Sequence, residues 1–258
     1  MLFVIDIGNT NIVLGVFDNE TIRAQWRAVT EKRKTADEYG IEIRDFFHYD
    51  DIHLEQIEGS IISCVVPTLQ ASFEQVCMKL FGRRPIVVGP GIKTGMPILY
   101  DNPKEVGADR IVNSVAAYHR FHDALISIDF GTATTFDVVS QKGEYLGGVI
   151  CPGIGISLEA LFFFASKLPR IEVGKPRSVI GKNTVESMQS GILYGYTGLV
   201  DGIIQRIWKE YGRKMKTIGT GGLCEMIAAE SETIEEVDQS LTLQGLRLLY
   251  QLNKPTAK

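Results

Sequence analysis

The chain has 258 residues, of which 45% are hydrophobic and 22% are charged, and its formal net charge is −4. These values are typical of globular proteins, and the length suits two small domains or one large domain. The weak negative charge gives no electrostatic basis for binding nucleic acid or an anionic membrane, so neither kind of partner is expected.

The four cysteines, at positions 64, 77, 151 and 224, are scattered and form no Cys-x-x-Cys pair. This pattern predicts reduced thiols and argues against a zinc site. The first apolar run has no basic region before it, and no apolar run approaches the ~18 residues of a membrane span. We therefore expect a cytoplasmic protein without a signal peptide or a transmembrane helix.

Residues 2–17 consist of two apolar runs joined by a small polar turn. Both runs are rich in Val, Ile, Leu and Phe, which predicts two buried strands. In the turn, Gly8 permits close approach of a ligand, and backbone N–H groups with the Thr10 hydroxyl can face an anion. Asp6 ends an apolar strand, where a carboxylate needs a hydrogen bond, water or a cation. A phosphate-binding turn and a hairpin whose Asp6 caps its own turn are both open here.

A second stretch repeats this pattern. Residues 129–134, Asp-Phe-Gly-Thr-Ala-Thr, align with residues 6–11, Asp-Ile-Gly-Asn-Thr-Asn, and the flanking apolar runs align as well. The chain therefore holds two copies of a strand–turn–strand unit, one opening each half, and such repeats guide fold assignment. Two turns of this kind facing each other across a cleft would hold a polyphosphate from both sides.

The first half alternates strands with helices. After the hairpin we expect a strand at 21–27, a helix starting at the N-cap Thr35, a strand at 59–66, a helix at 68–81 and a strand at 85–88. This β-β-β-α-β-α-β order indicates an α/β fold with an antiparallel start. Residues 89–110 are dense in Gly and Pro, which predicts a loop to about Lys104, followed by a helix over 104–121.

The second half continues in the same style. We expect strands flanking the repeated turn and at 145–150, a helix to about 165, a surface connector at 167–182, a long helix from the N-cap Asn183 to about 211, a strand and Gly-rich turn at 217–223, a helix at 240–252 and a frayed tail at 255–258. The Gly-rich segment 151–157 is either an anion site or a tight packing turn. Phe162–Phe164 either pack at an interface or fill the core.

The long helix carries a stripe of glycines at positions 191, 195, 198 and 202. Each glycine costs a helix about 0.5–1 kcal/mol relative to alanine. Four such costs indicate close approach to another element, which is either a helix of the same chain or the same helix of a second subunit.

Asp109 and Arg110 lie near the start of the helix that follows the Gly/Pro-rich loop. An acidic residue there complements the helix dipole, and the pair also suits a surface ion pair. A functional role is the third interpretation, and the residues by themselves leave all three open.

The paired turns resemble the phosphate motifs of the actin and sugar-kinase ATPase superfamily. Tyr100-Asp-Asn-Pro followed by Glu105-Val-Gly-Ala-Asp-Arg110 resembles the pantothenate-site signature of type III pantothenate kinases, and this resemblance covers essentially the whole chain. Gly219-Thr-Gly-Gly222 resembles the superfamily's adenosine motif. The resemblance implies an α/β fold of two ribonuclease-H-like halves, residues 1–122 and 123–258, each a mixed sheet with helices, with ATP in the cleft between them.

The implied activity is transfer of the γ-phosphate of ATP to the hydroxyl of pantothenate, giving 4′-phosphopantothenate, the first step of coenzyme A biosynthesis. In this family Asp109 corresponds to the general base. The residues matching Tyr100, Gly107, Ala108 and Arg110 contact pantothenate. The family is homodimeric, and the residue matching Thr184 reaches the partner's pantothenate site.

The resemblance also implies the remaining ligands. The phosphates of Mg-ATP would be held by the first turn, and the full set of residues is Asp6, Ile7, Gly8, Asn9, Thr10, Asn11, Ile12 and Val13. Thr132 would reach the nucleotide from the second turn. Asp129 would bind a monovalent cation, potassium or ammonium, and Mg²⁺ would bridge phosphates while keeping several waters.

Two alternatives remain at this point. One is a kinase of the same superfamily that acts on another small alcohol, against which the Tyr100–Arg110 segment argues. The other is a non-enzymatic regulatory relative with the same fold, which would have no need of Asp109. The sequence lacks Gly-x4-Gly-Lys-Ser/Thr, which excludes a P-loop kinase.

Overall fold

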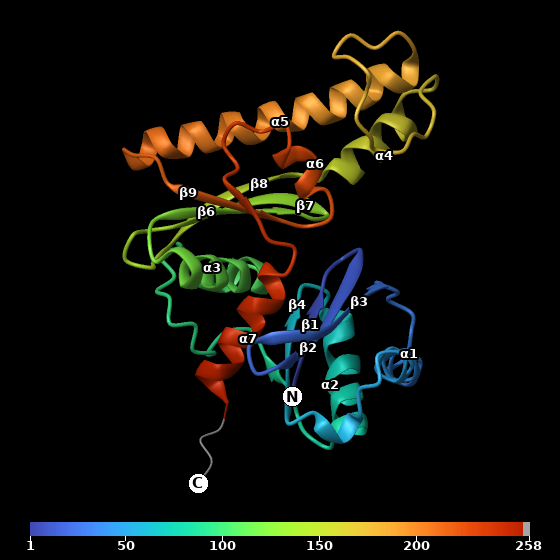
Figure 1. The fold of residues 1–258 in the computed structure, drawn as a ribbon, viewed down its shortest axis with the longest axis vertical. Helices are drawn as coiled ribbons and strands as arrows, with labels where there is room; N and C mark the ends of the chain where they lie inside the picture. Colours follow the sequence, from blue (N-terminus) through green and yellow to red (C-terminus); the bar gives the residue numbers. More distant parts are fainter. Residues whose placement is uncertain (255–258) are drawn as a thin grey trace. The chain divides into compact units, whose positions relative to one another are not determined.

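The computed structural model describes residues 1–254, and its contacts divide the chain into two units. One unit joins Met1–Ala116 to the segment beginning at Ser240, and the other is Ala117–Gln239. Each unit holds one five-stranded sheet (Figure 1). The predicted halves, 1–122 and 123–258, assign the last helix to the second half, whereas its contacts place it in the first unit. The tail predicted at 255–258 lies outside the described residues.

The first sheet has the strand order β3-β2-β1-β4-β5, and its strands are β1 Leu2–Ile7, β2 Asn11–Asp18, β3 Thr21–Val29, β4 Gly59–Cys64 and β5 Ile86–Val87. β1 pairs antiparallel with β2 and parallel with β4, so the sheet is mixed. The predicted β-β-β-α-β-α-β order is confirmed, with helices α1 Ala36–Tyr49 and α2 Pro67–Phe81 between the strands. In the β1–β2 register, Asp6 lies opposite Val13.

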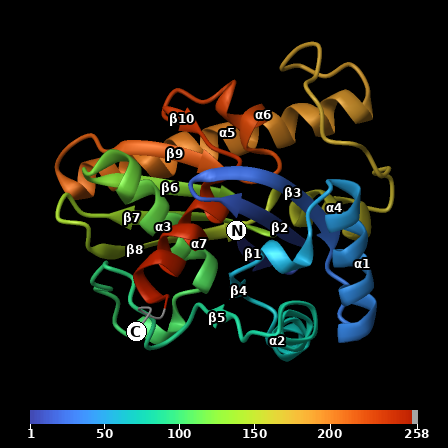
Figure 2. The same cartoon turned by 60° about the horizontal axis from the view of Figure 1, so that its bottom comes forward.

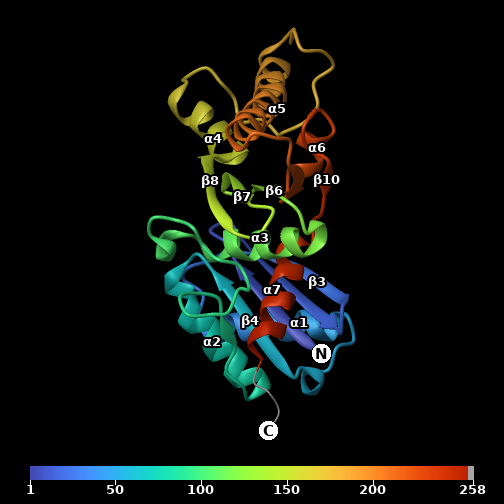
Figure 3. The same ribbon diagram turned by 90° about the vertical axis from the view of Figure 1, so that its left-hand side faces the viewer.

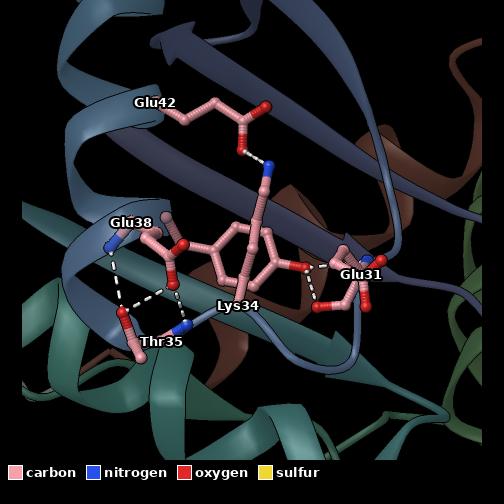
Figure 4. A network of polar contacts seen from close by, with 6 residues as sticks. Glu31, Lys34, Thr35, Glu38 and Glu42 are labelled. Atoms are coloured by element: carbon pink, nitrogen blue, oxygen red, sulfur yellow. Dashed lines mark hydrogen bonds and ion pairs between the residues drawn. The ribbon is translucent and has the colours of Figure 1, made fainter.

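The core of the first unit lies between its sheet and helices α1 and α2. Phe3 of β1 and Phe47 of α1 are fully buried and meet edge to face, with ring centroids 5.3 Å apart. α1 begins with the predicted N-cap: the Thr35 hydroxyl accepts the Glu38 N–H, and the Glu38 carboxylate accepts the Thr35 N–H at 2.8 Å (Figure 4). These two hydrogen bonds form a capping box, which fixes the start of the helix. Lys34 forms an ion pair with Glu42 at 2.9 Å beside this cap.

The second sheet has the strand order β10-β9-β6-β7-β8, and its strands are β6 Leu125–Phe130, β7 Ala133–Val139, β8 Tyr145–Pro152, β9 Lys216–Thr220 and β10 Glu236–Val237. β6 pairs antiparallel with β7 and parallel with β9, as β1 pairs with β2 and β4. The repeat in the sequence therefore corresponds to a repeated sheet topology. The short strand β10, which pairs with β9 (Figure 2), was not predicted.

The helices of the second unit are α4 Ile154–Phe164, α5 Thr184–Tyr211 and α6 Cys224–Ala228. α5 begins and ends as predicted: the Asn183 side chain accepts the Glu186 N–H at 2.9 Å, and Gly212 ends the helix at φ 86°. Its buried side chains, such as Leu193 and Val200, pack with strands β6 and β7 in one apolar core. The exposed fractions of Phe163 and Phe164 are 79% and 82%, so these two side chains do not fill the core.

One predicted boundary is wrong. Helix α3 spans Ala108–Phe121 and begins four residues after the predicted start at Lys104. Residues Pro103–Glu105 form a separate 3-10 turn, η2, capped by the Asn102 side chain, which accepts the Lys104 N–H. Asp109 therefore lies in the first helical turn of α3.

The last helix of the described chain, α7 Leu241–Asn253, packs on β1, β2 and β4 of the first sheet. Figure 3 shows it beside β4. A further short turn, η1, spans Leu54–Gln56. Within residues 1–254, no helix combines the length and the apolar sequence that crossing a bilayer needs.

Candidate active site

The first repeated turn is closed by its own backbone and braced by the next strand. The N–H of Gly8 donates to the carbonyl of Asn11 at 3.0 Å. Thr30, just after β3, holds the turn at two points: its hydroxyl donates to the Gly8 carbonyl at 2.7 Å, and its N–H donates to the Thr10 carbonyl at 3.0 Å. Sequence reasoning missed Thr30, because no local pattern connects it to a turn twenty residues earlier.

The predicted phosphate-binding residues of this turn differ in what they can offer a ligand. Asn9 and Thr10 are exposed, and Asp6 is partly exposed at the end of β1. Ile7 and Ile12 are fully buried, so their side chains belong to the core and only their backbone groups remain for binding. The turn thus presents polar side chains and backbone at its tip above an apolar base.

The second repeated turn has a different brace. The N–H of Gly131 donates to the Ala133 carbonyl at 3.1 Å, and the N–H of Gly153 donates to the Thr132 carbonyl at 3.1 Å. A methyl group at Gly153 would lie 2.6 Å from the Gly131 carbonyl oxygen and closer still to that of Thr132. Gly153, which precedes α4, therefore packs directly on the turn. The packing interpretation of the 151–157 segment is confirmed, and the anion interpretation stays a prediction.

Asp129 lies at the end of β6, opposite Thr135 of β7 and Thr220 of β9. Gly221 follows β9 with φ +96°, and a side chain there would meet the Asp129 carboxylate at 2.8 Å. The Gly-Thr-Gly-Gly segment therefore packs directly against Asp129. The resemblance of this segment to an adenosine motif did not predict that contact. Burial and then the Asp129 charge raise the pKa of the neighbouring Cys224 thiol to about 12, so Cys224 stays protonated.

The prediction of a cation at Asp129 depends on its carboxylate. Hard cations take oxygen ligands, and the Asp129 carboxylate is of that kind. Within residues 1–254, no group of three or more His, Cys, Asp or Glu side chains gathers as a metal site would require. A monovalent cation at Asp129 therefore stays a prediction.

Asp109 is held over Gly107 at the start of α3. Its carboxylate oxygen Oδ1 accepts the Arg110 N–H at 2.8 Å, and a methyl group at Gly107 would lie 2.5 Å from the same oxygen. Glycine is therefore required at 107 for this orientation. Burial raises the pKa of Asp109, and the N–H and the charge of Arg110 oppose that rise only in part. A carboxyl with a raised pKa in partly desolvated surroundings suits proton transfer.

The other predicted substrate residues of the first unit lie near Asp109 in the chain. Arg110 is buried, with 7% of its surface exposed, and Ala108 is the first residue of α3. Tyr100 is partly exposed and lies in the irregular loop before η2. The structure therefore joins Gly107, Asp109 and Arg110 in one turn, with Tyr100 on the segment that leads to it.

Thr184 belongs to the second unit. It is exposed as the first residue of α5 and lines an open cavity of about 690 Å³ together with Leu161, Lys182, Asn183 and Met188. The cavity lies between α4, the connector before α5 and the first turns of α5. The role of Thr184 in a pantothenate site stays a prediction.

Comparisons with a family model and with related sequences give the same family. The family model for type III pantothenate kinase matches residues 2–206. Proteins named type III pantothenate kinase from Geotalea uraniireducens and Myxococcus xanthus are 60% and 56% identical to this chain. These alignments cover 99% and 98% of this chain and 100% and 99% of the relatives.

Two solved structures share the fold at low identity. A protein of Campylobacter jejuni described as a Baf family transcriptional activator has a TM-score of 0.60 at 18% identity, covering 97% of this chain and 98% of its own. A protein of Sinorhizobium meliloti described as a 2-dehydro-3-deoxygalactonokinase has a TM-score of 0.58 at 12% identity, covering 100% and 98%. These likenesses concern the fold, whereas the sequence relatives decide the family. The chain belongs to the type III pantothenate kinase family.

Proposed function

We propose that the protein is an ATP-dependent pantothenate kinase that transfers the γ-phosphate of ATP to the hydroxyl of pantothenate and yields 4′-phosphopantothenate. This reaction is the first step of coenzyme A biosynthesis, and we place it in the cytoplasm. The observation that carries the proposal is the identity of 60% over 99% of the chain to a relative named for this activity. The regulatory alternative has no comparable support.

Phosphoryl transfer depends mainly on positioning and charge neutralisation, with an oriented nucleophile. In our proposal Asp109 accepts the proton of the substrate hydroxyl, and its raised pKa brings it closer to the strength of an effective base at neutral pH. Tyr100, Gly107, Ala108 and Arg110 orient pantothenate around it. Their placement on one loop and one helical turn supports this assignment.

The nucleotide would be bound by the repeated turns. The backbone groups of Asp6–Val13 and the polar side chains of this turn hold the phosphates, and Thr132 contacts the nucleotide. Mg²⁺ supplies charge neutralisation at the phosphates when it is bound. The two hydrogen bonds from Thr30 support this role, because a turn held at two points is preorganised for an anion.

The first test is ADP release from ATP with pantothenate, measured with and without potassium or ammonium. We expect turnover that requires one of these cations, because in our proposal Asp129 binds a monovalent cation, as the resemblance to type III pantothenate kinases implies. Asp129→Asn is expected to lose the cation stimulation while it retains its fold by circular dichroism. Turnover equal in sodium and potassium would remove the Asp129 assignment and keep the kinase. A folded wild-type protein with no turnover in any cation would contradict the proposed function.

We further propose that the protein is a homodimer joined through α5. Gly191, Gly195 and Gly198 are exposed, and a Cβ at any of them would meet no atom of the described residues within 4 Å. Close approach within the chain therefore does not explain these three glycines. A second copy of α5 would use the flat surface that they leave, and Thr184 on the same helix would then face the partner's substrate.

Gly195→Leu is expected to weaken the dimer, because an isobutyl group would keep two α5 helices from touching. Light scattering coupled to gel filtration should show the mass falling from dimer towards monomer. Gly40→Leu in α1 is the matched control, since Gly40 is also a helical glycine with open space around its Cβ position. An unchanged mass and an unchanged melting curve for Gly195→Leu would refute the close-approach model.

A further inference from the structure

Helix α7 contacts three elements of the first unit that carry proposed site residues. They are the β1–β2 hairpin with the Asp6–Val13 turn, helix α3 with Asp109, and the loop that contains Tyr100. None of the residues matched to the family signature lies on α7 itself. α7 therefore contacts all three segments that carry proposed site residues in the first unit, although it carries none of those residues itself.

On the sheet, α7 is seated where strand residues lack side chains. A methyl group at Gly15 of β2 would lie 3.0 Å from Leu243 Cδ1 and 3.1 Å from Val4 Cγ2. At the start of β4, a side chain at Gly59 would overlap the ring of Tyr250. Leu243 and Tyr250 thus occupy the space that Gly15 and Gly59 leave on the sheet. These two close contacts fix where α7 lies along the strands.

In the contact between α7 and α3, the glycine lies on α7 and the side chain that packs on it belongs to α3. A methyl group at Gly245 would lie 2.7 Å from Val112 Cγ1 and closer still to the Val112 carbonyl oxygen. Beside this contact, the Thr242 hydroxyl donates to the Asn113 side-chain oxygen at 2.7 Å. Val112 and Asn113 lie three and four residues after Asp109, so α7 touches α3 one helical turn from the proposed base.

At its other end, α7 holds the substrate loop. The Asn253 side chain accepts the Lys93 N–H at 2.9 Å and donates to the Lys93 carbonyl at 2.7 Å. This two-point pairing anchors the segment that leads to Tyr100. Helix α7 therefore links the sheet, α3 and the loop through close glycine contacts and hydrogen bonds, each of which fixes a separation between two elements.

We propose that Gly245 is a positioning residue for phosphoryl transfer: its missing side chain sets the separation of α7 and α3, and thereby the position of Asp109 relative to the Asp6–Val13 turn. Leu243 fixes α7 on the strand pair that carries the turn, so any increase in the α7–α3 separation displaces Asp109 from the phosphates. This inference rests on the proposed function, because it assigns Asp109 and the turn their roles.

The test is Gly245→Ala with full steady-state kinetics of pantothenate phosphorylation. The added methyl must reach an ordinary carbon–oxygen contact of ~3.3–3.6 Å with the Val112 carbonyl, so the helices must separate by about 1 Å. A misplacement of that size is expected to lower kcat by roughly 10- to 100-fold. The KM for ATP should change less than twofold, because the turn stays on its own strands.

Two variants separate positioning from general stability. Leu249→Ala removes a buried side chain of α7 that makes none of the positioning contacts described above, so it should lower the melting temperature with kcat close to wild type. Gly40→Ala repeats the glycine-to-alanine change in a helix with open space and should leave kinetics unchanged. If Gly245→Ala and Leu249→Ala reduce kcat and the melting temperature in the same proportion, α7 has only a structural role and the proposal is wrong.

Thr242 provides a second test that adds no atoms. Thr242→Val should lower kcat by roughly three- to tenfold, the factor that one neutral hydrogen bond supplies, and Thr242→Ser should restore it. If Gly245→Ala does not fold, this pair decides the question, and equal kcat for valine and serine overturns the proposal. Wild-type protein that is folded but fails to phosphorylate pantothenate would instead refute the proposed function, whatever the variants do.

Discussion

Replacement of Asp109 by asparagine is expected to lower kcat by roughly 10²–10⁴-fold, the range that general-base catalysis contributes. Asparagine keeps the oxygen that accepts the Arg110 N–H and keeps the fit over Gly107, but it cannot take the hydroxyl proton. Binding of ADP, measured by calorimetry, should stay within about twofold of wild type, because Asp109 lies on α3 and not in a phosphate turn. Retained turnover would remove the assignment of Asp109 as the base.

The pH dependence of stability provides a control for this variant. Because burial raises the pKa of Asp109, the folded protein binds this proton more tightly than the unfolded chain does. The stabilisation from that proton is complete below the ordinary aspartate pKa and is lost as the pH rises through the raised value. Asp109→Asn should therefore melt at the wild-type temperature or higher at pH 7, and this difference should vanish in acid. A variant that melts lower at pH 7 would contradict the inferred direction of the shift.

The same raised pKa affects the rate profile of the wild-type enzyme. The base is active only when it is ionised, so kcat should fall as the pH is lowered through the pKa of Asp109. That decline should begin at a higher pH than the ~3.9 of an ordinary aspartate would give.

Replacement of Gly153 by alanine is expected to disrupt the second turn. The new methyl group would overlap the carbonyl oxygens of Gly131 and Thr132, and neither is a side chain that can rotate away. Overpacking of this kind typically costs about 1–3 kcal/mol of folding free energy. We expect the KM for ATP to rise at least tenfold, because the displaced Thr132 belongs to the proposed nucleotide site, and the melting temperature to fall.

Gly155 supplies the matched control for this change. It lies two residues further along in α4, and a Cβ at its position would meet no atom within 4 Å. Gly155→Ala should leave the KM for ATP unchanged and raise stability slightly, because alanine favours the helix by about 0.5–1 kcal/mol. If Gly153→Ala behaves like Gly155→Ala in both measurements, the turn does not depend on the close packing described here.

The parts of the fold that could be predicted from the sequence are those set by local patterns. The hairpins at 2–17 and 125–139 are alternations of apolar runs with polar turns, and the long helix has clear capping residues at Asn183 and Gly212. The start of α3 was misplaced because Lys104 and Glu105 suit a helix, whereas the extended backbone of Val106 (φ −75°, ψ 122°) ends their 3-10 turn before α3 begins. Neighbouring residues in the sequence determine the hairpins and the ends of α5, whereas the start of α3 depends on backbone geometry that the sequence pattern does not show.

The candidate site divides in the same way. Asp6 could be selected because a carboxylate at the end of a buried strand is unusual, and Asp129 because it repeats Asp6 in the second half. Asp109 was selected only through the resemblance of its segment to the family signature. Thr30 and the contact of Gly153 with the second turn could not be predicted, because both depend on segments that meet only after the sheets assemble. The contact of Gly221 with Asp129 likewise depends on the pairing of β9 with β6, strands that are remote in the sequence.

The placement of α7 also has a consequence for how the chain folds as it is made. The second unit is one continuous stretch, whereas the first needs a segment that follows the whole of the second. A ribosome that adds ~5–20 residues per second requires on the order of ten seconds to pass from Ala116 to Asn253. During that time the strands that α7 covers stay exposed on the nascent chain. The N-terminal unit is therefore synthesised first and completed last.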